Sequence, residues 1–156
     1  MPESTHVLLI VAAGLNAVAS LLHVVIIVGG APWYRFFGAG ERFTRAAESG
    51  KWWPHAITLG IAAVLALWAV YALSGAGILP ALPWRKEVLI AITAIYAIRG
   101  LALFPALLLA RHMITPFVIG SSIICMGYGA VHLLGLVDAW PELAGIRSSG
   151  QPTSVA

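Results

Sequence analysis

The chain has 156 residues, of which 60% are hydrophobic and only 10% are charged, and its formal net charge is +3. Soluble domains carry about 25% charged residues, so this composition excludes a water-soluble fold, and lipid must cover most of the surface. The few basic residues lie between apolar runs rather than in one cluster, so we expect no nucleic-acid binding. The single cysteine, Cys125, excludes an internal disulfide and a CxxC redox pair.

Four apolar runs cover most of the chain, at residues 7–29, 54–75, 88–110 and 115–137. Each is close to the roughly 20 residues that an α-helix needs to cross a bilayer, and lipid leaves helices as the only structure for such runs. No basic residue precedes the first run, so we interpret it as a retained helix rather than a signal peptide. Short connections after the second and third runs make neighbouring helices antiparallel. The sequence therefore predicts an all-α membrane protein with four transmembrane helices in an antiparallel bundle.

The first connection, residues 30–53, is longer and combines seven aromatic residues with charged ones. Positions 36, 40, 43 and 47 form a largely apolar helical stripe, which predicts a short helix in the membrane interface. The alternative is an aromatic belt that anchors two helix ends, and a lid over an internal site is the functional interpretation. Residues 1–147 are expected to form one domain, and residues 148–156 a flexible tail.

Basic residues predict the orientation of the helices. The connections at 30–53 and 111–112 share five basic residues, and the opposite side has three. The excess places those two connections in the cytoplasm. We expect a multi-pass membrane protein with both termini on the side opposite the cytoplasm.

Arg99 is the one charged residue inside an apolar run, eleven residues from either end, at the expected midplane of the bilayer. An arginine there costs about 2.5–3.5 kcal/mol even on the modest insertion scales, so we expect it to face the bundle interior. No Asp or Glu lies at a comparable depth. Either Arg99 cross-links the bundle by bonding neutral acceptors, or it awaits an anionic ligand or an acid of a partner protein. The candidate ligand-binding residues are Arg99, Asn16, Ser20, His23, Tyr96, Tyr128 and His132.

The histidines do not predict a haem. His23 and His132 lie near the ends of antiparallel helices and approach opposite membrane surfaces, about 16 Å apart in depth, whereas one iron needs both close together. The sequence also lacks an HExxH motif and a carboxylate pair within the membrane. We therefore expect no metal, no cofactor and no assigned catalytic residue. Ser121, Cys125 and Gly129 form a small-residue ridge, a possible surface for homo-oligomers.

Several short motifs resemble a group of small four-helix bacterial inner-membrane proteins of unknown function. They are Leu22-His23 followed by Gly29-Gly30, then Arg99-Gly100, Thr115-Pro116-Phe117, and Ser121-Ser122 with Cys125. The resemblance implies a fold and a compartment, and no activity. From the residues themselves we predict a polar pocket around Arg99 that binds or passes a small anionic or amphipathic molecule among the membrane lipids. A membrane-embedded enzyme for a lipid-soluble substrate and an accessory subunit of a larger complex are the alternatives.

Overall fold

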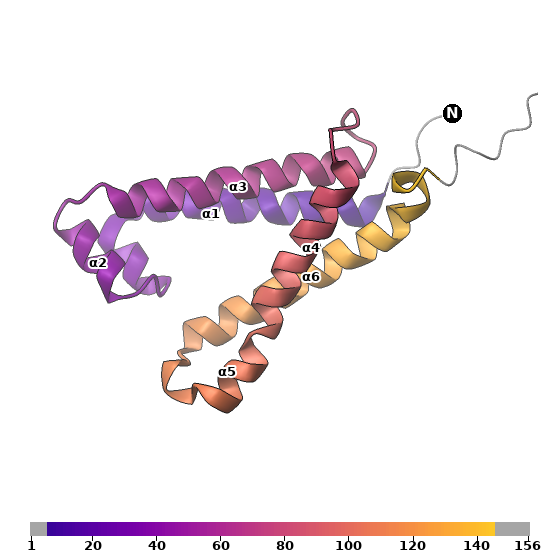
Figure 1. Cartoon of the computed structure of the whole chain (residues 1–156). Coiled ribbons are helices and arrows are strands. Elements are labelled where there is room, and N and C mark those ends of the chain that lie inside the picture. Colours follow the sequence, from indigo (N-terminus) through magenta and orange to yellow (C-terminus); the bar gives the residue numbers. More distant parts are fainter. Residues whose placement is uncertain (1–5, 146–156) are drawn as a thin grey trace, which may run out of the picture.

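The computed structural model describes residues 6–145, and this part of the chain is helical without strands (Figure 1). Four spans are long and apolar enough to cross a membrane: α1, α3, α4 with α5, and α6. The predicted all-α fold is therefore confirmed, whereas the predicted tail at 148–156 lies outside the described residues. In chain order the elements are α1 (Val7–Phe36), α2 (Glu41–Glu48), α3 (Trp53–Gly75), α4 (Arg85–Leu101), α5 (Leu103–Leu109), the 3₁₀ helix η1 (Arg111–Met113) and α6 (Pro116–Leu143).

Individual residues explain where the long helices are interrupted or begin. Gly30 in α1 has φ 65° and ψ −150°, which no right-handed helix contains, so the regular span ends where the predicted run ended. The predicted third run is divided into α4 and α5. Pro105 has no N–H to donate to the carbonyl of Leu101, and this lost bond accounts for the break. The Thr115 hydroxyl accepts a bond from the Val118 N–H at 3.2 Å and caps the start of α6.

The helices form two antiparallel pairs. α1 packs along α3 to make the first pair, and α4 packs along α6 to make the second pair. In Figure 1 the two pairs lie close together where α1 begins and α6 ends, and they separate toward the end that carries α2 and α5. The buried core occupies the close end, with Leu9, Ala12, Leu89 and Ala139 fully inaccessible to solvent. Packing between the pairs therefore depends mainly on one half of each long helix.

A second contact joins the pairs at their separated end. A Cβ atom on Gly38 would lie 2.5 Å from Cγ of Phe117, so the phenyl ring at the start of α6 packs directly on this glycine. Gly38 also has φ 61°, a conformation that favours glycine. The connection after α1 is thereby placed against α6.

The short helix predicted in the first connection is present as α2, although its apolar stripe differs from the expected one. Phe36 belongs to α1 and is 81% exposed, and the chain turns through Gly38 and Gly40, both with positive φ, before α2 begins. These turns interrupt the spacing that linked position 36 to position 43. Thr44 and Ala46 are the buried residues of α2. That this helix lies in the membrane interface remains a prediction.

Candidate functional site

A buried polar network ties the first helix pair to the second near the middle of the long helices. The Asn16 side chain of α1 is fully inaccessible to solvent. Its Oδ1 accepts a hydrogen bond from the Tyr96 hydroxyl of α4 at 2.6 Å, and its Nδ2 donates to Nε2 of His132 in α6 at 3.0 Å. One asparagine therefore connects three transmembrane helices.

The aromatic rings around Asn16 close this network. The Tyr96 ring stacks on the His132 ring at a centroid distance of 5.5 Å and meets the Tyr128 ring edge-on at 5.3 Å. The Tyr128 hydroxyl donates to the Leu15 carbonyl at 3.0 Å. Since Nε2 of His132 accepts from Asn16, a neutral His132 carries its proton on Nδ1, and Nδ1 has no hydrogen-bond partner within residues 6–145. The network is therefore complete except at one buried N–H group.

Arg99 lies outside this network. Its Nη1 donates to Ser122 Oγ at 3.0 Å and its Nη2 to Ser121 Oγ at 3.1 Å, so its acceptors are two neighbouring hydroxyls of α6. The residue is exposed, which corrects the expectation that it faces the packed interior. Three residues along a helix give a rise of about 4.5 Å beyond Tyr96, toward the end where the pairs separate. In the described part of the chain it forms no ion pair with a carboxylate.

The remaining two candidate residues make contacts within the first helix pair. The Ser20 hydroxyl donates to the Ala62 carbonyl of α3 at 2.8 Å. His23 Nδ1 donates to the Ala19 carbonyl of its own helix at 2.7 Å. The structure thus gathers Asn16, Tyr96, Tyr128 and His132 into one network, while Arg99, Ser20 and His23 each bond elsewhere.

Ser121 and Ser122 were absent from the predicted site, although they hold the cation. The signal that could have found them is the register of α4 against α6. A Cβ on Gly100 would approach the Met126 backbone nitrogen to 2.9 Å, and one on Gly129 would approach the Ala97 nitrogen to 3.2 Å. These close approaches fix the antiparallel register and bring the serines beside Arg99.

The small-residue ridge of α6 consequently faces α4 of the same chain at two of its positions. Ser121 bonds Arg99, and Gly129 is buried against α4. Cys125 is half-buried and packs against the core that contains Tyr96. Association of two copies through this ridge remains a prediction.

The described residues contain no group of three or more His, Cys, Asp or Glu side chains that could hold a metal ion.

Outside the spans, His6 lies before α1, with Nδ1 2.7 Å from Asp138 and Nε2 3.1 Å from Glu142, both on α6. Burial lowers the pKa of His6, but the bonds to these two carboxylates and their charges outweigh burial and raise the pKa above 6.5. This cluster fastens the beginning of α1 to the end of α6.

Together the fold and the polar contacts define, over residues 6–145, a helical protein with four spans suited to a membrane, joined by an internal polar network and carrying Arg99 well inside the third span. No family model, curated protein or solved structure matches the chain.

Proposed function

We propose that this integral membrane protein binds or passes a small anionic or amphipathic molecule whose acidic group pairs with Arg99. The observation that carries the proposal is a cation within a transmembrane span whose described polar partners are only two neutral hydroxyls. Arginine at mid-membrane costs about 2.5–3.5 kcal/mol. Hydrogen bonds between transmembrane helices contribute about 0.6 kcal/mol each on average, so the two serines offset less than half of that cost.

The guanidinium has the donors that an acid requires. Arginine carries five N–H groups, and the two serines accept from two of them, which leaves three for a ligand. Carboxylates and phosphates match the planar fork of these groups. Because Ser121 and Ser122 hold both terminal nitrogens, the fork is oriented before a ligand arrives, which reduces the entropic cost of binding.

The surroundings of Arg99 suit the apolar part of such a molecule. Ile98 and Leu101 beside it on α4 are 69% and 54% exposed, and Ile124 on α6 is 58% exposed. The helix break after Leu101 adds a carbonyl that Pro105 cannot satisfy. Interrupted helices at membrane depth are tolerated where the freed backbone groups are buried in protein or line a water-filled cavity. The acidic group of an amphipathic ligand would therefore pair with the Arg99 cation, and its apolar part would contact these exposed side chains.

A second candidate role follows from the exposure of Arg99. A residue reachable from outside the helix pairs can meet an Asp or Glu on a helix of another protein, which would make this chain an accessory subunit of a membrane complex.

We also propose the bacterial inner membrane as its location with both termini in the periplasm. The support for this orientation is the five-to-three distribution of basic residues between the two sides.

The test compares purified wild-type protein with Arg99→Leu, Arg99→Lys and the double variant Ser121→Ala/Ser122→Ala. Small molecules retained by each protein are extracted and identified by mass spectrometry, and folded yield is measured in parallel. Arg111→Leu is the control, because Arg111 is an exposed cation in the connection before α6.

We expect an acidic molecule that is retained by wild type and Arg111→Leu, lost from Arg99→Leu, and reduced in the serine variant, with similar folded yields. If Arg99→Leu and Arg99→Lys both fail to accumulate, Arg99 is a structural cross-link and the proposal is wrong. A stoichiometric protein that co-purifies and is lost with Arg99→Leu would instead assign the accessory role.

A further inference from the structure

A basic pocket lies beside α2, at the end of the molecule opposite the buried core and separate from Arg99. It has a volume of about 510 Å³, and its lining includes Arg42, Arg45, Lys51 and Trp53 with one acidic residue, Glu41. α2 connects the span of α1 to the span of α3. A short segment between two membrane spans is expected near the lipid headgroups, where phosphates are abundant.

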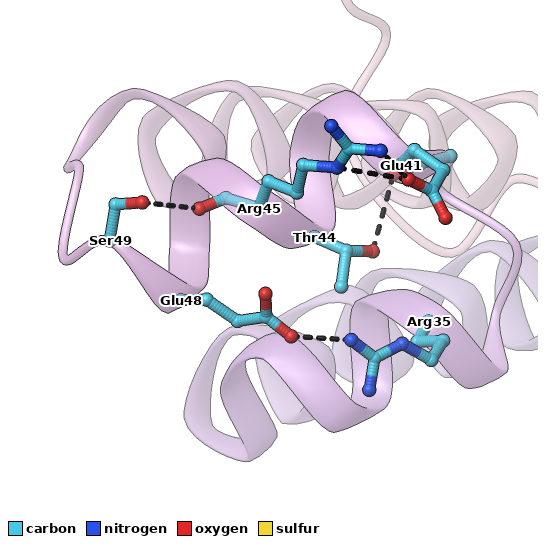
Figure 2. A network of polar contacts seen from close by, with 7 residues as sticks. Arg35, Glu41, Thr44, Arg45, Glu48 and Ser49 are labelled. Atoms are coloured by element: carbon cyan, nitrogen blue, oxygen red, sulfur yellow. Dashed lines mark hydrogen bonds and ion pairs between the residues drawn. The ribbon is translucent and has the colours of Figure 1, made fainter.

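Ion pairs neutralise two basic residues of this region, and two others have no ion pair within the described residues. Figure 2 shows Arg45 reaching back along α2 to Glu41, and Glu48 reaching from α2 to Arg35 at the end of α1. Both available acids are thereby occupied. Arg42 and Lys51 form no ion pair with any residue in the described range 6–145. The pocket therefore carries two uncompensated positive charges.

The main chain at Lys51 and the side chain of Arg42 are each held by a local contact. Gly50, with φ 68°, ends α2, and the Lys51 N–H donates to the Ala46 carbonyl at 2.9 Å, which is a Schellman closure of the helix. The Arg42 guanidinium lies over the Trp53 ring, 5.6 Å from its centroid. The main chain of Lys51 is thus fixed at the end of α2, and the Arg42 guanidinium is positioned by the first residue of α3.

We propose that this pocket binds the phosphate of an anionic lipid headgroup through Arg42 and Lys51. A phosphodiester with a single negative charge can accept charge-assisted hydrogen bonds from both side chains. Trp53 beside the pocket and Trp52, 78% exposed, are the aromatic residues that favour the membrane–water boundary. The acyl chains would then follow the outer surface of α3 into the bilayer. The site shares no residue with the Arg99 site.

The experiment measures lipid retention by native mass spectrometry. Delipidated protein is titrated with dioleoyl phosphatidylglycerol or dioleoyl phosphatidylcholine, and the ratio of their apparent affinities is compared between variants. The test variant is Arg42→Gln/Lys51→Gln. The control, Lys86→Gln/Arg111→Gln, also removes two positive charges, but from residues outside the pocket. A parallel titration of wild type adds inorganic phosphate as a competitor.

We expect a preference for phosphatidylglycerol that falls about tenfold in Arg42→Gln/Lys51→Gln, as the loss of charge-assisted bonds implies, and that remains in the control and in Arg99→Leu. An unchanged preference in the test variant, or an equal loss in the control, would overturn the pocket. Displacement of the lipid by millimolar inorganic phosphate would assign the site to a water-soluble phosphate and overturn the lipid assignment.

Discussion

Replacing Asn16 with alanine should weaken the packing between the two helix pairs. The change removes the bonds to Tyr96 and His132 and leaves two buried polar groups unpaired. Each buried group left without a partner costs about 1–3 kcal/mol, so we expect a loss of about 2–6 kcal/mol in the free energy of unfolding. Tyr96→Phe leaves only one buried group, Asn16 Oδ1, without a partner and should cost about 1–3 kcal/mol.

The measurement is reversible unfolding in mixed micelles with increasing SDS, followed by circular dichroism. Thr93→Val is the matched control, because its buried hydroxyl donates only to the Leu89 carbonyl of its own helix, and we expect a change within about 0.5 kcal/mol. In the double variant Asn16→Ala/Tyr96→Phe the second substitution should add little, since its bond is already lost. A cost of Asn16→Ala no larger than that of Thr93→Val would refute the role of this network.

Two further predictions concern His6 at the beginning of α1 and the contact between α4 and α6. The raised pKa of His6 means that its contribution to stability is complete below pH 6.5 and is lost as the pH rises through that raised value. SDS unfolding at a series of pH values should show this loss in wild type, and His6→Ala should flatten it; an unchanged profile would contradict the prediction. Gly100→Ala places a Cβ 2.5 Å from Met126 Cγ and 2.9 Å from the Met126 backbone nitrogen, so it should cost about 1–3 kcal/mol. At Gly60 a Cβ meets nothing within 4 Å, so Gly60→Ala should not lower the free energy of unfolding. Equal effects at both glycines would contradict the prediction, because they would show that α4 can move away from α6 at little cost.

The fold could be predicted because an apolar run of this length can adopt few structures in lipid. The sequence predicted the four spans and the helix in the first connection. It did not predict the break after Leu101, although Pro105 was visible, because a proline can bend a membrane helix without interrupting it. The turns at Gly38 and Gly40 likewise divided a spacing that looked continuous.

The candidate site was only partly predictable, because depth along a helix does not determine lateral position. Counting residues placed Asn16, Tyr96 and Arg99 near one level, and the first two do meet. Arg99 lies three residues beyond Tyr96, near the end of α4, and its partners depend on the register set by Gly100 and Gly129. That register arises from close packing of backbones, which no single-helix pattern reveals.

The long sequence separation within the central network has a consequence for biosynthesis. The partner of Asn16, Tyr96, follows it in the chain after 80 residues. At about 5–20 residues per second, a ribosome needs about 4–16 s to make that stretch. The first helix pair is complete at Gly75, before Tyr96 is made, and at that point the Asn16 amide has neither of its final partners. The Asn16 amide is therefore satisfied by its native partners only after α4 and α6 have joined the first helix pair.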